Sequence, residues 1–302
     1  KVGKVVAYVK KHGIQLIHCH LPWAGIVGRL VGKKTGVPVI YTEHNKWERY
    51  HKLTYFLNKA SFSSQQRVIA VSDDVAQSIK KHYKRSVPLV QVVLNGINTE
   101  KFSKSFSSDK HIRKDLNIPA DAIVIGLACV FRVQKRLLVW LQIAKQLHQQ
   151  FPNVHFIIAG DGPLRETVFS KAEELQMQSY LHFVGLQPEI RPYLQAMDIF
   201  MMSSEFEGLP IALLEAMSME CMPASTAAGG IPELIKHERN GLLVPVDQPM
   251  SLVETLTPYL EKPEKIHLLA KAARETVESD FSMQQMVNDL EQIYLELLNQ
   301  KL

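Results

Sequence analysis

A short stretch of the sequence, EFEGLPIALLEAM (205–217), combines a carboxylate, a tight turn and a helix start. Pro210 suits the first helical position because its φ is fixed and it lacks an N–H, so a helix should begin there. The backbone amides near Gly208 and Leu209 would then face the space beyond the helix start, which favours an anion. Gly208 has no Cβ to keep a ligand away, and Glu207 can accept hydrogen bonds from sugar hydroxyls.

The same stretch holds a second carboxylate, Glu215, within the apolar helical segment. An unpaired carboxylate in apolar surroundings costs several kcal/mol. Glu215 therefore needs hydrogen-bond donors, and the two adjacent hydroxyls of a ribose would supply them. The alternative is that Glu215 lies on an exposed helix face and Glu207 lies in a solvated loop.

Two basic residues, Arg132 and Lys135, follow the predicted strand AIVIGLACV (122–130). Ligands of α/β sheets bind at the carboxyl ends of strands, where two cations would suit a diphosphate. The alternative is a solvated basic loop. The sequence contains no D-x-D triplet to hold Mg²⁺ or Mn²⁺ on that diphosphate, so we expect no metal. GDGP (160–163) lacks the third glycine of a dinucleotide fingerprint, so we expect no NAD and no other bound cofactor.

Polar residues also follow the predicted strand VPVIYT (37–42). Glu43 and His44 should emerge at the carboxyl edge of this sheet. His44 could hydrogen-bond a sugar or assist a hydroxyl proton, since imidazole titrates near neutral pH. The alternative is an ordinary polar surface residue. His18 and His20 share one face of a strand without further metal-ligand spacing, so we expect packing or lining of the site rather than a metal.

Short apolar runs alternate with stretches of helical period, which predicts parallel sheets covered by helices on both faces. The predicted strands are 15–18, 37–42, 67–72 and 87–94, and then 122–130, 153–160, 180–185, 198–204 and 220–226. Helical period marks 22–34, 73–84 and the amphipathic tail from Met283. Between the two sets of strands, a turn at NGIN (95–98) and the polar stretch 101–110 indicate a domain junction.

We therefore predict three parts: a first domain over 1–96, a second over 97–282, and a helix over 283–302 that packs back on the first domain. The first domain should be incomplete. A doubly wound domain opens with a strand, whereas residue 1 already lies in a helical segment, so we expect its first βα unit or units to be missing.

Charge is unevenly distributed along the 302 residues. Residues 1–95 carry 16 Lys and Arg against four acids, a net +12, whereas residues 96–302 have a net −7. The basic half favours an anionic partner such as a membrane surface. We expect no nucleic acid, because no zinc-finger spacing, RNP-like motif or Arg-rich arm accompanies the charge. The alternative is that lysine pairs at helix ends complement helix dipoles.

Three widely spaced cysteines favour a reducing cytosol. No apolar run reaches the roughly 18 residues that span a bilayer. We therefore expect a cytoplasmic protein, and hypothesise peripheral binding at the inner face of a membrane. The segment WERYHKLTYFLNKA (47–60) mixes aromatic and basic residues suited to anionic headgroups. Its alternative is a core helix with a solvated basic face, and its predicted core stripe is Tyr50, Leu53, Leu57 and Ala60.

The E-x7-E pattern of Glu207 and Glu215, with G-L-P after the first Glu and E-A-M from the second, resembles the signature of retaining glycosyltransferases of family 4. Further stretches resemble that family in the same order along the chain: NGINTEKF (95–102), AGDGPLRE (159–166), HFVGLQPEI (182–190), GGIPELI (229–235), NGLLVP (240–245) and the IYLELL tail.

This resemblance implies an α/β GT-B fold: two Rossmann-like doubly wound domains facing across a cleft, with a nucleotide sugar mostly on the second and a hydroxyl-bearing acceptor on the first. Lys135 and Arg132 would replace a metal on the nucleoside diphosphate, and His44 matches the acceptor-side histidine. Glu207 would hold the transferred sugar. The residues implied in donor binding are Gly208, Leu209, Pro210, Glu215 and Leu186.

The implied reaction is retaining, metal-independent transfer to an acceptor such as a lipid-linked or cell-surface glycan precursor. Two alternatives remain: a nucleotide-sugar epimerase of the same fold, and a nucleotide-sugar-binding protein without activity. The chain departs from the family at some positions. Many members place the Arg where this chain has Val130, so Arg132 corresponds less closely than Lys135 does. Glu220 and Met222 stand where Gly and Pro are usual.

Overall fold

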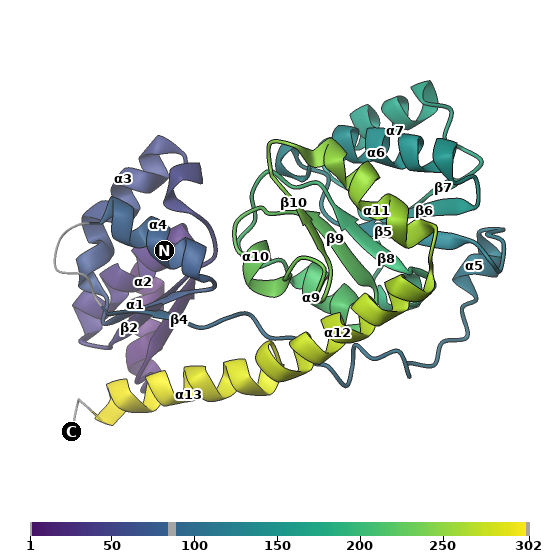
Figure 1. The fold of residues 1–302 in the computed structure, drawn as a ribbon. Helices are drawn as coiled ribbons and strands as arrows, with labels where there is room; N and C mark the ends of the chain where they lie inside the picture. The colour runs from purple at the N-terminus through teal and green to yellow at the C-terminus, as the bar shows by residue number, and fades with distance from the viewer. Residues whose placement is uncertain (1, 84–88, 300–302) are drawn as a thin grey trace. The chain divides into compact units, whose positions relative to one another are not determined.

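The structure is a computed structural model that describes residues 2–83 and 89–299. The chain divides into two compact units (Figure 1). The first unit comprises Lys1–Asn95 with Gln284–Leu302, and the second comprises Gly96–Met283. Each unit contains one parallel sheet.

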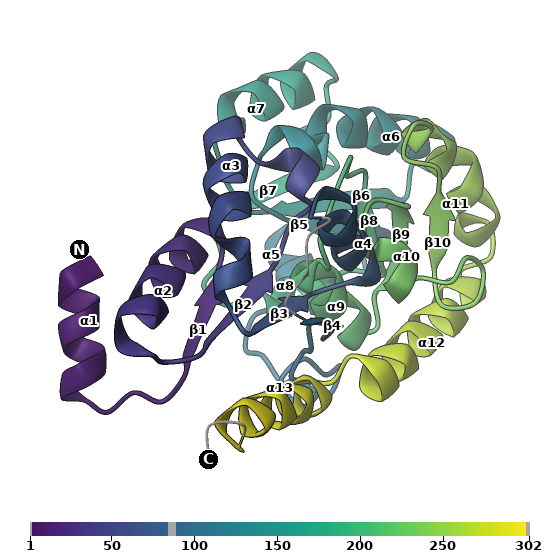
Figure 2. The same cartoon turned by 90° about the vertical axis from the view of Figure 1, so that its left-hand side faces the viewer.

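The first unit has a four-stranded sheet in the order β1-β2-β3-β4 (Figure 2). Because the strands follow chain order and such crossovers are right-handed, the connecting helices share one face. The strands are β1 Ile17–His20, β2 Val39–Glu43, β3 Arg67–Ala70 and β4 Leu89–Val92. The helices are α1 Val2–Lys11, α2 Pro22–Thr35, α3 Lys52–Ser61 and α4 Asp73–His82, with short 3-10 turns at Trp47–Arg49 and Phe62–Ser64.

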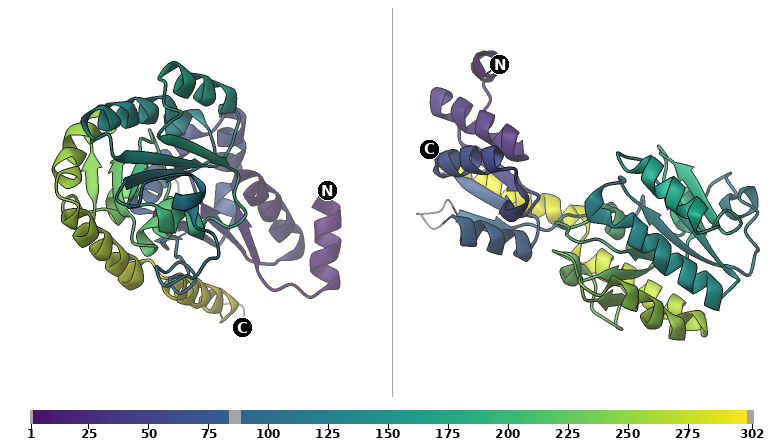
Figure 3. Two further views of the ribbon diagram at one scale, coloured as in Figure 1. Left: turned by 90° about the vertical axis from the view of Figure 1, so that its right-hand side faces the viewer. Right: turned by 90° about the horizontal axis from the view of Figure 1, so that it is seen from above.

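Alternate side chains of β2 enter two different layers. Tyr41 lies against α2, since a Cβ added to Gly25 would come within 2.8 Å of its ring. Ile40 points the other way and joins a buried cluster with Ile293 and Leu297 of α13 (Met283–Asn299). In the right panel of Figure 3, the yellow α13 runs alongside the blue strands of this sheet. The amphipathic C-terminal helix therefore covers the second face of this sheet.

The second unit has a six-stranded sheet in the order β10-β9-β8-β5-β6-β7. Its strands are β5 Ile123–Ala128, β6 Val154–Ala159, β7 Leu181–Gly185, β8 Ile199–Met202, β9 Met222–Thr226 and β10 Leu242–Val244. Its helices are α5 Ile112–Asp115, α6 Leu137–Gln150, α7 Arg165–Glu174, α8 Arg191–Ala196, α9 Ile211–Ser218, α10 Ile231–Leu234, α11 Leu252–Leu260 and α12 Glu264–Asp280, with 3-10 turns η3 Val133–Lys135 and η4 Pro249–Ser251.

The order of the second sheet reverses between β5 and β8. From β5 the chain proceeds outward to β6 and β7, and it then returns to β8 and proceeds the other way to β9 and β10. In open α/β sheets, ligands bind outside the carboxyl ends of the strands at this kind of switch point. The loops that follow β5 and β8 are therefore placed to form a ligand site.

The predicted strands are confirmed, with displaced ends. β1 lies two residues later than the predicted 15–18, and the short β10 was not predicted. Residues 84 and 87–88 of the predicted elements, and residues 300–302 of the predicted tail helix, lie outside the described residues. No helix among the described residues has the length and apolarity that a membrane crossing requires.

The predicted core stripe of residues 47–60 is wrong. In α3, Leu53 is 57% exposed and Leu57 39% exposed, and Ala60 is also exposed. The helix instead buries Asn58, whose side-chain oxygen accepts a 2.6 Å hydrogen bond from the buried Arg29 of α2. A paired polar contact thus replaces the apolar one that the helical spacing indicated.

Candidate functional site

The loops at the switch point of the second sheet bring Lys135 and Glu207 into contact. Lys135 ends η3, which follows β5, and Glu207 lies in the loop after β8. The Lys135 Nζ donates to Glu207 Oε1 at 2.6 Å, and the two side chains are only 16% and 8% exposed. A cation and a carboxylate, 72 positions apart in sequence, therefore form an ion pair at the edge of the sheet where ligands bind.

The two loops are fixed to each other by hydrogen bonds. The Ser203 hydroxyl donates to the carbonyl oxygens of Lys135 and Arg136, at 3.1 and 3.2 Å. The backbone N–H of Glu205 donates to the carbonyl of Gln134 at 2.8 Å. These contacts hold the Lys135–Glu207 pair on rigid backbone, which a binding site requires for defined geometry.

A third loop packs against the Glu207 backbone. Gly229 has a φ of +60°, and a Cβ there would lie 1.9 Å from the Glu207 carbonyl oxygen. The N–H of Gly230 donates to the Gly208 carbonyl at 2.9 Å. The GGIPELI motif therefore supports the Glu207 loop, and only glycine fits at its first close approach.

The turn before α9 follows Glu207 directly in the sequence. Leu209 and Pro210 are buried, and Gly208 is partly exposed. The helix begins at Ile211 with Pro210 as the N-cap, so the predicted helix start is one residue too early. Ligand binding at these three residues, predicted from the sequence, remains a proposal.

Glu215 lies half-buried in α9, and burial raises the pKa of its carboxyl to about 7. Lys101 opposes this rise and Glu189 adds to it. In the described part of the chain, no side chain donates a hydrogen bond directly to the Glu215 carboxylate. Sequence reasoning did not single out Lys101 or Glu189, although both lie in stretches that carry the family resemblance.

Two predicted site residues lie apart from this ion pair. Arg132 is exposed immediately before η3, and Leu186 is 73% exposed immediately after β7. Both follow the carboxyl ends of their strands, as predicted for Arg132. Among the described residues neither forms a side-chain hydrogen bond or ion pair with Lys135 or Glu207, so their roles remain proposals.

The structure explains why glycine is the usual family residue where this chain has Glu220. Glu220 adopts a φ of +56°, the left-handed region in which a Cβ is unfavourable and glycine is preferred. The following strand, β9, nevertheless begins at Met222. The loop therefore keeps the backbone shape that glycine would allow, and Glu220 adopts it at some cost.

His44 follows β2 in the first unit and contacts a second histidine. Its Nε2 lies 2.9 Å from Nδ1 of His20, at the end of β1. Burial and the nearby His20 lower the pKa of His44 to about 4, so its expected titration near neutral pH is wrong. His18 lies beside His20, and its pKa is also lowered to about 4, mainly by burial. A neutral His44 can donate or accept a hydrogen bond at neutral pH.

Glu43 does not emerge at the sheet edge as expected. It is fully buried, and its carboxylate accepts hydrogen bonds from Trp47 Nε1 and the Tyr41 hydroxyl, both at 2.9 Å. The Tyr50 hydroxyl and the backbone amides of residues 44 and 45 also donate to it. Burial still raises the pKa of Glu43 to about 7. Its donors come from its own strand and the following loop, so Glu43 holds that loop in shape.

Within residues 2–83 and 89–299, no group of three or more His, Cys, Asp or Glu side chains is arranged to hold a metal ion. The neighbouring histidines at 18, 20 and 44 form no such group either.

Comparison with known proteins identifies the family. The sequence model of the family Glycosyl transferases group 1 matches residues 108–276, which is more than half of the chain. That of Glycosyltransferase Family 4 matches residues 2–101. The chain belongs to the glycosyl transferases of group 1, and the predicted membership and enzyme class are confirmed.

Relatives and solved structures agree with this assignment. The chain is 25% identical over 304 residues to the UDP-Gal:alpha-D-GlcNAc-diphosphoundecaprenol alpha-1,3-galactosyltransferase of Escherichia coli, covering 97% of this chain and 78% of that one. It is 28% identical over 279 residues to the putative teichuronic acid biosynthesis glycosyltransferase TuaC of Bacillus subtilis, covering 88% and 66%.

The fold is shared with HepE of Anabaena, solved in complex with UDP, at a TM-score of 0.86 and 20% identity over 98% of this chain and 82% of that one. Sucrose-phosphate synthase of Thermosynechococcus elongatus gives a TM-score of 0.87 at 21% identity over 99% and 77%. The predicted α/β GT-B fold is confirmed.

Proposed function

We propose that this glycosyltransferase moves a sugar from a nucleoside-diphosphate sugar to an acceptor hydroxyl, with retention of anomeric configuration and without a metal. The observation that carries the proposal is the Lys135–Glu207 ion pair at the switch point of the second sheet. The titles of fold neighbours that contain UDP or UDP-glucose support a nucleotide-sugar donor.

Lys135 is the proposed partner of the departing diphosphate. Negative charge grows on the diphosphate as the bond to the sugar breaks, and a cation held in place by the protein stabilises that charge. Lys135 is mostly buried, so its charge is poorly screened by water. We assign the exposed Arg132, on the same loop, to the outer side of the diphosphate.

Glu207 is the proposed partner of the transferred sugar. Its Oε1 accepts from Lys135, which leaves Oε2 as an acceptor for sugar hydroxyls. Gly208, Leu209 and Pro210 would bring the backbone before α9 close to the sugar and its phosphate.

Glu215 is the proposed partner of the ribose. Its carboxyl is half-buried, with a pKa raised to about 7. Two ribose hydroxyls would donate to the ionised carboxylate and offset the cost of burying it. Leu186, exposed after β7, would supply apolar contact to the donor.

Retention follows in this proposal from the engagement of Glu207. A double displacement needs a carboxylate free to attack the anomeric carbon from the face opposite the leaving group. Glu207 is bound by Lys135 and is assigned to sugar hydroxyls. We therefore infer attack on the same face as the departing diphosphate, where one of its oxygens can take the acceptor proton.

On the first unit, His44 is the proposed acceptor-side residue. With a pKa of about 4 it is neutral at neutral pH, so it would orient a hydroxyl by hydrogen bonding rather than act as a strong base. His20, which contacts Nε2 of His44, fixes the imidazole and leaves Nδ1 for the ligand.

The proposed acceptor is a lipid-linked or cell-surface glycan precursor, which would bring the enzyme to an anionic membrane surface on the cytoplasmic side. The names of relatives support this: one acts on a sugar linked to diphosphoundecaprenol, and another is assigned to teichuronic acid biosynthesis.

A transfer assay tests the proposal. The protein is incubated in EDTA with UDP-, GDP- and ADP-sugars and candidate acceptors, and the product anomer is identified by NMR. Transfer with retained configuration in EDTA supports the proposal. An inverted product contradicts retention, and activity restored only by added metal contradicts metal independence. Isomerised donor without acceptor would instead indicate an epimerase.

A further inference from the structure

The apolar residues of α3 face outward. Leu53, Phe56 and Leu57 are 57%, 65% and 39% exposed, and their spacing places them on one side of the helix. The opposite side is secured by the Arg29–Asn58 hydrogen bond. The helix is therefore amphipathic, but its apolar side faces solvent, whereas the apolar side of a core helix faces the protein interior.

Basic residues border this apolar side. Lys52 and Lys59 lie on α3 and are exposed, and Lys81 lies on the neighbouring α4 with its side chain 72% exposed. Among the described residues, no carboxylate pairs with Lys52 or Lys59. Lys81 is 3.5 Å from Glu48, a distance at which an exposed pair contributes little. Positive charge is therefore available along the edge of the apolar side.

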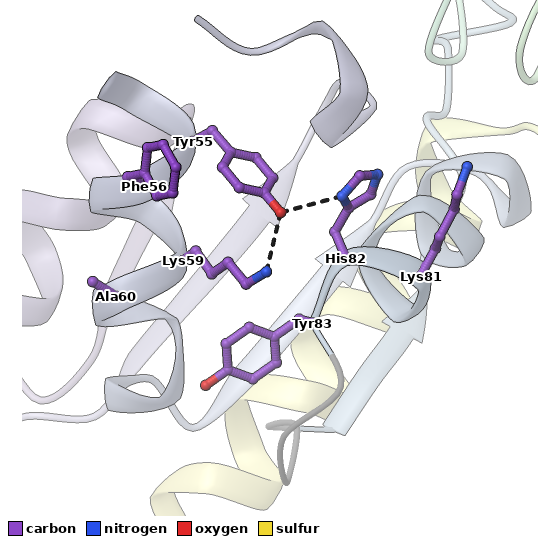
Figure 4. A pocket seen from close by; sticks show the side chains of 7 residues that line it. All are labelled: Tyr55, Phe56, Lys59, Ala60, Lys81, His82 and Tyr83. Atoms are coloured by element: carbon purple, nitrogen blue, oxygen red, sulfur yellow. Dashed lines mark hydrogen bonds between the residues drawn. The ribbon is translucent and has the colours of Figure 1, made fainter. Parts of the chain in front are cut away.

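A pocket of about 720 Å³ opens between the two helices (Figure 4). Lys59 Nζ donates to the Tyr55 hydroxyl at 3.1 Å, and that hydroxyl lies 3.3 Å from His82 Nδ1. The described lining contains no Asp or Glu; it consists of Tyr55, Phe56, Lys59, Ala60, Lys81, His82 and Tyr83. Aromatic walls with basic groups suit an anionic group that has an apolar body.

We propose that this surface, which we call the α3 face (Lys52, Leu53, Phe56, Leu57, Lys59 and Lys81), docks on an anionic phospholipid bilayer. The three apolar side chains enter the boundary between headgroups and acyl chains, and the lysines contact lipid phosphates. One headgroup phosphate enters the pocket beside Lys59. The net charge of +12 on residues 1–95 gives an attraction of the same sign.

This inference deepens the proposed function, since its purpose rests on the membrane-bound acceptor, but docking itself requires no donor or acceptor. Co-sedimentation with vesicles of phosphatidylcholine alone, and of phosphatidylcholine with phosphatidylglycerol, measures it directly. We expect binding to the anionic vesicles only, weakened by salt because surface charges are screened.

Two variants and a control locate the surface. Lys52→Gln with Lys59→Gln should lower the partition coefficient by about fivefold for each lysine, roughly 25-fold together. Phe56→Ser should lower it by about tenfold or more, because a buried aromatic ring is lost. Leu268→Ser with Lys262→Gln, exposed residues of the second unit, should bind as the original protein does. Transfer to a water-soluble acceptor should be unchanged in all three.

Equal binding to neutral and anionic vesicles, or unchanged binding by the α3-face variants, would overturn the inference. If those variants instead abolish a dimer seen by size-exclusion chromatography without altering vesicle binding, the surface joins two copies of the chain, and the inference is also overturned. Absence of transfer to the soluble acceptor by the original protein would count against the proposed function alone.

Discussion

Two buried carboxylates, Glu43 in the first unit and Glu207 in the second, lie at or just beyond the carboxyl end of a central strand and differ in what surrounds them. Glu43 is fully buried and accepts hydrogen bonds from two tyrosines, a tryptophan and two backbone amides. Glu207 is also buried, but its side chain accepts a hydrogen bond from Lys135, on a different loop.

The difference shows how a carboxylate's partners indicate its use. Five donors to Glu43 occupy both of its oxygens and come from its own strand and loop, so its removal should damage the fold locally. In the part of the chain that the structure describes, Glu207 has one cationic partner, at the switch point of its sheet, so a ligand can reach the remaining acceptor positions. Burial alone does not distinguish the two roles.

The largest expected effect is on the rate of transfer, when the partner of Glu207 is removed. Lys135→Ala removes the cation proposed to stabilise the departing diphosphate, and the rate of transfer should fall by about 10²–10³-fold. Steady-state kinetics with a fixed donor measure the change. Lys271→Ala, an exposed lysine of α12, is the matched control and should retain full activity. A loss below threefold would mean that Lys135 does not contact the diphosphate.

Substitution of Glu43 should change the stability of the first unit rather than donor binding. Glu43→Gln places an NH₂ group against donors, and the free energy of unfolding of the first unit should fall by about 3 kcal/mol. Hydrogen exchange of β2 amides and isothermal titration with the donor separate the two effects. Glu291→Gln on the exposed side of α13 is the control. A weaker donor affinity with unchanged exchange would reverse the assignment of Glu43.

Glu215 is a third, half-buried carboxylate, and its raised pKa predicts how stability and donor binding change with pH. Its pKa in the fold is raised from 4.5 to about 7, so its contribution to stability is fully present below pH 4.5 and is lost as the pH rises through about 7. Donor binding should run the other way, because the ionised form accepts the ribose hydroxyls.

Affinity for the donor should therefore increase from about pH 6 to about pH 8, and Glu215→Gln should weaken it about tenfold at the higher pH and remove most of the dependence. Isothermal titration at several pH values measures both effects. An equal pH dependence in the variant would assign the titration to another group.

The smallest expected effect concerns backbone shape at Glu220, in the loop between α9 and β9. Glu220→Gly relieves the left-handed conformation of Glu220 and should stabilise the second unit by roughly 0.5–1 kcal/mol. The ion pair with Lys104, at 3.7 Å and partly exposed, offsets little of this gain. Thermal unfolding measures the difference, and a lower melting temperature would show that the side chain of Glu220 contributes more than its backbone costs.

Sequence patterns were sufficient for nine of the ten strands described and for α2, α4 and α13, because apolar runs and helical spacing report directly on burial. It was not sufficient for α3, where the buried position is Asn58, paired with Arg29 from another helix. Likewise, whether Glu43 turns inward depends on Trp47 and Tyr50 closing over it, which no local pattern shows.

The site itself was predicted in parts. Lys135 was chosen for its place after a strand and Glu207 for its place before a turn and a helix start, and each was assigned to a bound ligand. Their contact depends on β8 pairing with β5, a non-sequential pairing that the sequence did not reveal. The link between His20 and His44 similarly requires that β1 and β2 be neighbours.

A crystal structure of the protein with a nucleoside-diphosphate sugar, grown in EDTA, would show whether Lys135 and Glu207 bind the donor. We expect Lys135 Nζ within about 3 Å of a diphosphate oxygen, sugar hydroxyls on Glu207 and ribose hydroxyls on Glu215. A diphosphate bound away from the ends of β5 and β8, with Lys135 contacting only Glu207, would contradict this expectation.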